Sequence, residues 1–307
     1  MIVDVVIPCY NGEKYLRRAI DSVVNQTFKV NKIIVVNDGS SDKSEDLLRE
    51  LSVLYPNLHI ISQTNQGLSS ARNTGICASQ ADLIALLDVD DYWKPDKLRC
   101  QVEYLRSNPK KIAVFSSFLE NRDGEIKDGK DAPQSVIVTP RSILLQLTFF
   151  PGSGSSILFR SSLLKEFKNQ LFDPSFSFAE DLDCWIRILA LGEVGVIKSR
   201  DVIIDVRSDS MQRLSQKNPM LYLDNLLLIL WMHRELISKF EYFFHRYFII
   251  YQGFKFNFSI KFSNSGFAQI SQNFPLLGRI PSILVLRFVS LLMMPVYWVY
   301  RKVFANK

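Results

Sequence analysis

Short apolar runs alternate with segments of helical periodicity over the first hundred residues. Four runs have the length and the β-branched composition of buried strands, at residues 3–7, 33–36, 58–61 and 83–87. Between them, apolar residues recur every three or four positions, which is typical of helices that cover a sheet. Strands that alternate with helices favour a largely parallel sheet. The pattern therefore predicts an α/β fold that begins βαβαβαβ.

Polar residues ahead of the helical segments are candidates for N-caps, because their side chains can accept a hydrogen bond from the first helical N–H groups. Asn11 precedes the first of these segments. Ser41 or Asp42 is expected to cap the second helix and Ser69 the third. Each predicted helix thus starts a few residues after a strand ends.

The pattern loosens from about residue 112 into shorter runs, which predicts mixed strands and helices. An Asp/Gly/Lys-rich segment over 122–133 is expected to be a loop, and a Gly/Ser segment over 151–156 a turn. A helix is predicted over 178–191. Beyond residue 218 the chain favours long apolar helices, at about 219–238, 241–260 and 281–304. We therefore expect one domain over 1–210 and a helical extension over 211–307.

Composition and charge separate these two parts. The chain has 307 residues, 47% hydrophobic and 22% charged, which excludes disorder, collagen and coiled coil. Four cysteines without paired spacing indicate reduced thiols in a cytosolic compartment. Residues 241–307 hold eight lysines or arginines, one acidic residue and 17 of the 37 aromatic residues. That concentration predicts a different solvent or partner for the end of the chain.

The apolar segment 282–300 suggests what that partner is. It carries one charge, Arg287, and contains Pro295, both of which argue against a simple transmembrane helix. Trp298 and the neighbouring tyrosines suit a membrane interface, and basic flanks suit anionic lipid. We expect peripheral association with the cytoplasmic face of a membrane. The alternative is a hydrophobic helix that packs on the domain or on a second subunit of a homo-oligomer.

Polar residues follow three of the predicted strands, at the sheet edge where open α/β sheets bind ligands. PCYNG follows the first strand, NDGSSD the second and DVDD the fourth. An Asp-Gly-Ser turn by itself is a common way to leave a strand. Together, the three segments are expected to converge on one crevice.

The acidic cluster of Asp88, Asp90 and Asp91 is the most informative of these segments. Three adjacent carboxylates repel one another unless a cation or hydrogen-bond donors neutralise them. Carboxylate oxygens suit Mg²⁺ or Mn²⁺, and Mg²⁺ usually completes its coordination with water and phosphate oxygens. The cluster thus predicts a metal site and a phosphorylated substrate. The alternative, an acidic helix N-terminus, accounts for Asp91 but not for Asp88.

The chain resembles family 2 glycosyltransferases of the glycosyltransferase A fold. The resemblance rests on VVIPCYNGEKYLRRAIDSVVNQTF, VVNDGSSD, NQGLSSARNTGI, LLDVDDYW and FAEDLDCWIRIL in this order, and it covers about residues 1–205. It implies a Rossmann-like nucleotide-diphospho-sugar transferase domain with a mixed central sheet. It also implies an inverting enzyme that uses a nucleotide-diphosphate sugar and a divalent cation, Mn²⁺ or Mg²⁺.

The same resemblance assigns the donor nucleotide to the first two strand ends. Pro8, Tyr10 and Asn11 would line the base and ribose pocket, and Asp38 would accept a hydrogen bond from the base. Arg72 would lie beneath the donor and hold the acidic loop. The chemistry is reasonable, because a ring can pack on a base and a carboxylate can accept an imide N–H. The structural alternatives are that Tyr10 covers the sheet edge, that Asp38 caps a helix and that Arg72 forms a surface ion pair.

For the acidic loop, the resemblance implies a division of roles. Asp88 and Asp90 match the family's DxD element, with Asp88 on the ribose or the donor sugar and Asp90 on the metal. The metal would offset the charge that grows on the departing nucleoside diphosphate. Asp91 extends the cluster and would support it.

On the acceptor side, the resemblance points to Glu180 and Asp181. Asp181 would serve as the general base that takes the acceptor's hydroxyl proton, with Glu180 beside it. Without the resemblance, acidic residues in a first helical turn are usually dipole partners. Trp185 would floor an acceptor pocket or pack in the core. The segment 151–156, with Arg160, resembles the family's loop and strand that face the acceptor.

We therefore expect transfer of one sugar, with a UDP-sugar as the favoured donor, to a glycan or polyprenyl-linked glycan, with no nucleic-acid partner. A nucleotidyltransferase is one alternative, because it also needs nucleotide, diphosphate and a carboxylate-bound metal. A catalytically silent binding module that docks at a membrane is the other.

Overall fold

The computed structural model describes residues 1–129, 139–140, 153–176, 178–206, 219–236 and 242. The chain divides into two compact units, one of Met1–Ile143 and Thr148–Arg213, the other of Leu144–Leu147 and Leu214–Lys307. The predicted domain boundary at 210/211 falls outside the described residues. Within the described residues, no helix has both the length and the apolar character needed to cross a membrane.

The first unit begins with the predicted βαβαβαβ arrangement. Its elements are β1 (Val3–Cys9), α1 (Leu16–Val24), β2 (Lys32–Asp38), α2 (Ser44–Leu54), β3 (Leu58–Gln63), α3 (Leu68–Ala78) and β4 (Leu83–Leu86). The strands lie in the order β3-β2-β1-β4 and are all parallel. The carboxyl ends of β1, β2 and β4 therefore meet at one edge of the sheet, as the apolar pattern predicts.

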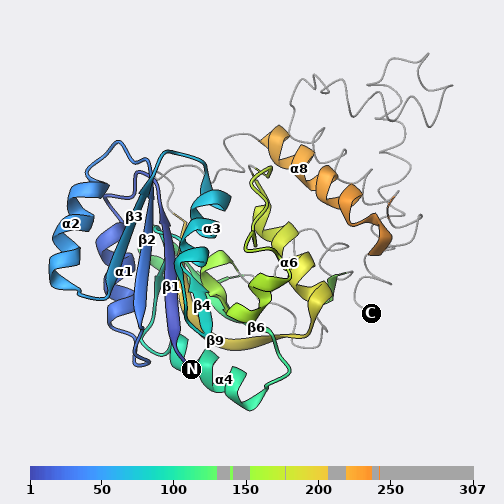
Figure 1. Ribbon diagram of the computed structural model, residues 1–307, viewed down its shortest axis with the longest axis horizontal. Helices are drawn as coiled ribbons and strands as arrows, with labels where there is room; N and C mark the ends of the chain where they lie inside the picture. Colours follow the sequence, from blue (N-terminus) through green and yellow to red (C-terminus); the bar gives the residue numbers. More distant parts are fainter. Residues whose placement is uncertain (130–138, 141–152, 177, 207–218, 237–241, 243–307) are drawn as a thin grey trace. The chain divides into compact units, whose positions relative to one another are not determined.

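The two faces of this parallel sheet are covered by different helices (Figure 1). Val5 and Ile33 belong to the buried cluster that includes the apolar residues of α1 and α2. Val6 and Val36 alternate with them and face α3. At Gly75 of α3, an added Cβ would lie 2.4 Å from Val6 Cγ1, so only glycine lets this helix approach the sheet so closely.

The sheet continues with strands of both directions. The remaining elements of the unit are β5 (Tyr92–Trp93), α4 (Lys97–Ser107), β6 (Ala113–Arg122), β7 (Glu125–Asp128), η1 (Gly154–Ser156), β8 (Ile157–Arg160), η2 (Ser161–Lys165), α6 (Glu180–Leu191) and β9 (Val194–Asp205). β8 is antiparallel to β4 and β6, β9 is parallel to β6, and β5 is antiparallel to β9. The sheet is therefore mixed, as expected.

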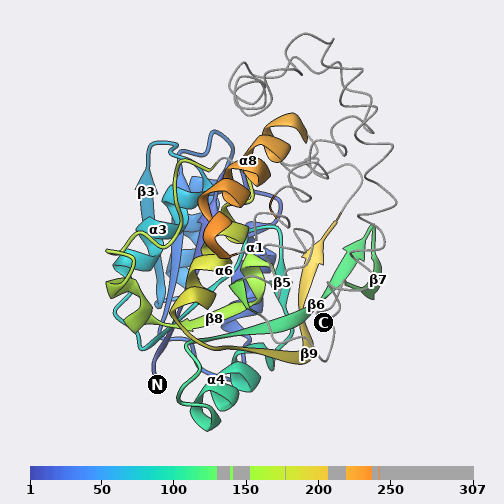
Figure 2. The same cartoon turned by 90° about the vertical axis from the view of Figure 1, so that its right-hand side faces the viewer.

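The strand order also requires the sheet to curl. β5 follows β4 after five residues, yet β8, β6 and β9 lie between them in the order β3-β2-β1-β4-β8-β6-β9-β5. The connection is not extended, because the Asp91 backbone N–H donates to the Asp88 carbonyl at 3.0 Å. A connection shortened in this way can reach across three strands only if the sheet bends back on itself (Figure 2). The connection is residues 87–91, which we call the acidic loop. The curl brings the end of β9 and the η1 turn to this loop.

One local prediction was wrong. The segment predicted as a loop over 122–133 contains strand β7, which pairs with β6 through an Asp123-Gly124 turn. Both turn residues have positive φ, 53° and 93°, and Asp-Gly is a strong hairpin signal. The turn predicted at 151–156 is confirmed where the structure describes it, because residues 154–156 form the 3-10 turn η1.

The residues predicted as caps do not occupy the N-cap positions, although Asp42 Oδ1 accepts the backbone N–H of Ser44, the first residue of α2, at 3.0 Å. Tyr15, Lys43 and Gly67 occupy the N-cap positions of α1, α2 and α3. Asn11 has a φ of 51°, and its Oδ1 accepts the backbone N–H of Ser41 at 2.8 Å. Its amide thus links the loop after β1 to the loop after β2 and is not available to cap α1.

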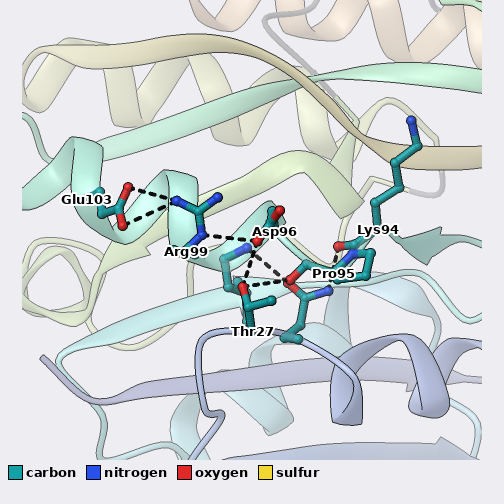
Figure 3. Close-up of polar contacts among 8 residues, drawn as sticks. Thr27, Lys94, Pro95, Asp96, Arg99 and Glu103 are labelled. Atoms are coloured by element: carbon teal, nitrogen blue, oxygen red, sulfur yellow. Dashed lines mark hydrogen bonds and ion pairs between the residues drawn. The ribbon is translucent and has the colours of Figure 1, made fainter.

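The chain that leaves the acidic loop is fastened at the start of α4 (Figure 3). The Thr27 backbone N–H donates to the carbonyl of Pro95 at 2.9 Å, and its hydroxyl donates to Asp96 Oδ1 at 2.9 Å. Arg99 reaches Asp96 and Glu103 on the surface of α4. These contacts tie the segment after β5 to the loop after α1.

In the second unit, α8 spans Pro219–Met232 and a 3-10 turn, η3, spans Arg234–Leu236. This confirms most of the helix predicted at 219–238. Trp231 is exposed, and the Arg234 guanidinium lies 4.7 Å from its ring centre. Apart from residue 242, the helices predicted at 241–260 and 281–304 lie outside the described residues, as do Pro295 and Trp298.

Candidate functional site

The three carboxylates of the acidic loop have different partners. Asp88 pairs with Arg72, with 2.7 Å between Oδ1 and Nη2. Asp91 is buried and accepts hydrogen bonds from the Ser155 hydroxyl and the Asp205 backbone N–H. Asp90 is exposed. No group of three or more His, Cys, Asp or Glu side chains in the described ranges could hold a cation. The expected three-carboxylate cluster is thus corrected to one outward carboxylate, with two neighbours engaged by protein.

Asp90 fits a divalent cation that takes one protein carboxylate and completes its shell with phosphate oxygens. Surrounding protein that displaces water, together with the charge of Asp88, raises the pKa of Asp90 to about 6, although the residue still has exposed surface. Its backbone carbonyl accepts Arg18 Nη2 at 2.6 Å. A carboxylate whose ionised form is disfavoured by neighbouring acids gains most from a bound cation.

Arg72 joins the acidic loop to the start of α6. Its side chain is buried, and Nη1 donates to Glu180 Oε1 at 2.8 Å while Nη2 donates to Asp88. Burial disfavours its charge, but the carboxylates of Asp88 and Glu180 raise the pKa of Arg72. The guanidinium lies 4.9 Å from the ring centre of Phe172, whose backbone forms two hydrogen bonds with the Asn73 amide. Helix α3 thus holds both sides of the site.

Asp181 is the second residue of α6 and is partly buried. Burial and the adjacent Glu180 raise its pKa to about 7, against the lowering effect of Arg72. The helix is preceded by Ala179 in a left-handed conformation, φ 56°, which costs energy in a residue other than glycine. A carboxylate with a pKa near neutrality has the basicity that general-base catalysis requires.

Residues of the predicted nucleotide pocket lie at the ends of β1 and β2. Pro8 is buried within β1, and Tyr10 is 49% exposed directly after this strand. Asp38, the last residue of β2, is buried. Its carboxylate accepts hydrogen bonds from Gln63 Nε2 and from the backbone N–H groups of Gln66 and Gly67, at 2.7–2.9 Å. Asp38 therefore fixes the loop that leads into α3.

Comparison with protein families now identifies this arrangement. The model of "Glycosyl transferase family 2" matches residues 4–167, more than half of the chain. The chain belongs to this family. The match includes the strand ends, Arg72 and the acidic loop, and it decides against the nucleotidyltransferase alternative.

Curated relatives of this family 2 glycosyltransferase include GlyA of Streptococcus pneumoniae and EpsJ of Bacillus subtilis, the latter an uncharacterized glycosyltransferase. GlyA is 38% identical over 121 residues, which cover 38% of this chain and 16% of GlyA. EpsJ is 31% identical over 185 residues, 59% of this chain and 54% of EpsJ. The matched segments thus span about half or less of these relatives.

Solved structures similar to this family 2 glycosyltransferase share its fold. TarS 1–349 of S. aureus in complex with UDP-GlcNAc superposes with a TM-score of 0.59 at 18% identity, over 83% of this chain and 73% of that one. The mannosyltransferase PcManGT of Pyrobaculum calidifontis, in complex with GDP-Man and Mn²⁺, gives 0.57 at 18% identity, over 77% and 65%. The fold is therefore the glycosyltransferase A fold.

Two residues expected near an acceptor lie elsewhere in this family 2 glycosyltransferase. Trp185 is fully buried and packs edge-on against Phe115 and Phe172, at 5.1 and 6.0 Å between ring centres, so the core-packing alternative is correct. Arg160 lies opposite Leu83, at the start of β4, and donates to the carbonyls of Lys111 and Leu105. That is the end of the sheet away from the acidic loop.

Three residues at the site were missed in the sequence. Arg18 of α1 bridges the Asp90 carbonyl and the Asp205 carboxylate, at 2.6 and 2.7 Å. Asp205 ends β9, so the rule that ligand-binding residues follow strands could have found it. Ser155 stands in the segment 151–156, which is expected to face the acceptor or to form a plain turn, and its contact with the acidic loop is not part of that expectation. Nothing in the sequence near Arg18 indicated its role.

Proposed function

We propose that this chain is an inverting glycosyltransferase that moves one sugar from a nucleotide-diphosphate donor to a hydroxyl of a glycan or lipid-linked glycan. The observation that carries the proposal is the buried bridge of Arg72 between Asp88 and Glu180. This bridge supports the proposal, because the carboxylates of the acidic loop and of the start of α6 both meet one arginine. A transferase needs both within the length of one reacting sugar.

Asp181 is the proposed general base. In an inverting transfer, the acceptor oxygen attacks the anomeric carbon on the face opposite the departing diphosphate, and a carboxylate on that side removes the hydroxyl proton. A pKa of about 7 lets Asp181 be ionised at neutral pH and still hold a proton well. Glu180, tied to Arg72, sets the position of the helix start from which Asp181 projects.

Asp90 is the proposed protein ligand of Mn²⁺ or Mg²⁺, and Asp88 the contact to the ribose or the donor sugar. When bound, such a cation offsets the negative charge that develops on the leaving diphosphate. Arg72 holds Asp88 in place, and Arg18 holds the Asp90 backbone. Asp91, which is buried, supports the loop from behind.

A uridine base fits the surroundings of Asp38 better than a guanine base. Each carboxylate oxygen has two acceptor positions; Oδ1 accepts two hydrogen bonds and Oδ2 accepts one. One position therefore remains, which suits the single imide N–H of uracil, whereas guanine offers several donors on its edge. A UDP-sugar is accordingly favoured over a GDP-sugar. Pro8, Tyr10 and Asn11 would border the same base and ribose.

The proposed acceptor is a glycan on a polyprenyl carrier at the cytoplasmic face of a membrane. The basic, aromatic composition of residues 241–307 supports this localisation. Liposome co-sedimentation tests it: binding to anionic vesicles at low salt is expected. A chain that stays fully in the supernatant would contradict membrane association and favour packing on protein or in a homo-oligomer.

Calorimetric titration with UDP, GDP and TDP, each with and without Mn²⁺, tests the donor site. We expect binding of UDP that is strengthened by Mn²⁺. Detection of product with a UDP-sugar and a lipid-linked acceptor would then establish transfer. Failure of all three nucleotides to bind would contradict the proposed enzyme and favour the catalytically silent binding module.

A further inference from the structure

We infer that Ser155 is a positioning residue of the donor site, whose hydroxyl fixes the acidic loop so that Asp90 can hold a cation. The inference rests on the proposed function, because it concerns the cation and nucleotide that this function requires. Ser155 belongs to η1, more than sixty residues from the acidic loop in sequence. Its role follows from contacts that only the curled sheet creates.

The Ser155 hydroxyl contacts the aspartates before and after Asp90 in the acidic loop. Ser155 Oγ accepts the backbone N–H of Asp88 at 3.0 Å and donates to Asp91 Oδ2. Ser155 is fully buried, and Asp91 is 4% exposed. In such surroundings a hydrogen bond constrains geometry strongly, because water cannot replace a lost partner.

The acidic loop is braced from the opposite side as well. Asp91 Oδ1 accepts the Asp205 backbone N–H at 3.2 Å, and Arg18 connects the Asp205 carboxylate with the Asp90 carbonyl. Asp90 is therefore the exposed member of a loop whose two neighbouring aspartates are both held. Its carboxylate can meet a cation without first ordering the backbone that carries it.

Ser155 is itself held from behind. Trp93 Nε1 donates to the Ser155 carbonyl at 2.9 Å, and Gln101 Nε2 donates to the Ser156 carbonyl at 2.7 Å. Beside it, an added Cβ on Gly154 would lie 2.9 Å from Arg72 Nη2 and 3.2 Å from Asp88 Oδ2. The turn thus fits closely against the Arg72–Asp88 pair and cannot shift away from the loop.

Ser155→Ala tests the inference, with Ser156→Ala as a matched control. Ser156 is equally buried in the same turn, but its hydroxyl donates to the Ser153 carbonyl and has no contact with the acidic loop. Calorimetric titration with UDP in saturating and limiting Mn²⁺ is the readout. For Ser155→Ala we expect Mn²⁺-dependent UDP binding weakened by about 10- to 100-fold. UDP binding without metal should match that of Ser156→Ala.

The possible outcomes separate the inference from the proposed function. If the unmodified chain binds no nucleotide, the proposed function fails first. If it binds UDP with Mn²⁺, and Ser155→Ala and Ser156→Ala weaken this binding equally, the positioning role is overturned.

A second variant keeps the test available if Ser155→Ala does not fold. Asp91→Asn preserves shape but alters the group that the Ser155 hydroxyl meets. It should also weaken Mn²⁺-dependent binding. Where both single variants fold, the double variant should lose no more than the weaker-binding single variant, because both substitutions act on the same contact. Unchanged Mn²⁺-dependent binding in Asp91→Asn, or fully additive losses, would contradict the inference.

Discussion

The acidic loop and the Glu180–Asp181 pair are two carboxylate groups that face the same arginine but are supported differently. The acidic loop is held by contacts from α1, α3, η1 and β9. The pair opens helix α6, with Glu180 bonded to Arg72 and Asp181 accepting the N–H of Leu182 at 2.9 Å. The site therefore braces one group from many elements and sets the other at the end of one helix.

The pKa values show what this difference means for chemistry. Burial has the largest effect in both groups: it raises the pKa of Asp90 to about 6 and the pKa of Asp181 to about 7. The next cause is a neighbouring carboxylate in each, Asp88 for one and Glu180 for the other. A braced carboxylate suits the fixed geometry of a cation, whereas a basic carboxylate at a helix start suits proton transfer.

Replacement of Arg72, which both carboxylate groups contact, should disrupt both groups at once. Arg72→Met leaves Asp88 and Glu180 without their buried partner, so we expect loss of both donor binding and transfer and about 3 kcal/mol less unfolding free energy. Arg17→Met is the control, because Arg17 forms an exposed pair with Glu50. Urea unfolding measures the difference, and equal stability of the two variants would contradict the bridge.

Asp181→Asn should affect the acceptor side alone. Without a base, kcat should fall by about 10²- to 10⁴-fold. UDP and Mn²⁺ binding should stay near that of the unmodified chain, because the acidic loop does not depend on this carboxylate. Transfer assays and calorimetry together check the prediction. Retained turnover would mean that another group removes the proton.

Asp90→Ala should affect the donor side. We expect Mn²⁺-dependent UDP binding to weaken by at least about tenfold, since loss of a direct ligand costs no less than loss of a supporting contact. Asp46→Ala, which removes an exposed carboxylate from the first turn of α2, should bind normally. If Asp90→Ala and Asp181→Asn lose nucleotide binding to the same extent, the separate metal and base roles are untenable.

The pH dependence of kcat should report the acceptor side. Asp181 acts as a base only when ionised, and its pKa is raised to about 7. The rate should therefore rise about tenfold per pH unit below this value and level off above it. A rate that is flat between pH 5 and 7 would contradict Asp181 as the base.

The smallest expected change comes from Glu180→Gln. Removal of the Glu180 charge lowers the pKa of Asp181, so the rising limb of the profile should move toward lower pH by a fraction of a unit. If Glu180→Gln only displaced the start of the helix, kcat would fall but the rising limb would stay at the same pH. Glu193→Gln, an exposed residue paired with Lys111, provides the unshifted reference profile.

Much of the first hundred residues follows from the sequence. Buried parallel strands read as continuous apolar runs, so β1 to β4 and the helices between them could be located within a few residues. The polar residues at the ends of these strands then predicted the acidic loop, and the family motif ARNTG predicted Arg72. The hairpin of β6 and β7 was missed because exposed strands such as Glu125–Asp128 lack an apolar run, although the Asp-Gly turn signalled it.

The sequence by itself determined the family, the parallel half of the sheet and the residue types of the two carboxylate groups, since these depend on local periodicity and short motifs. The tertiary structure alone decided which carboxylate faces outward, that Trp185 packs in the core, and that Ser155 and Asp205 meet the acidic loop. These depend on a sheet that curls until β5 pairs with β9. Contacts between residues so far apart in sequence leave no periodic pattern in the chain, because they arise only when separate elements pack.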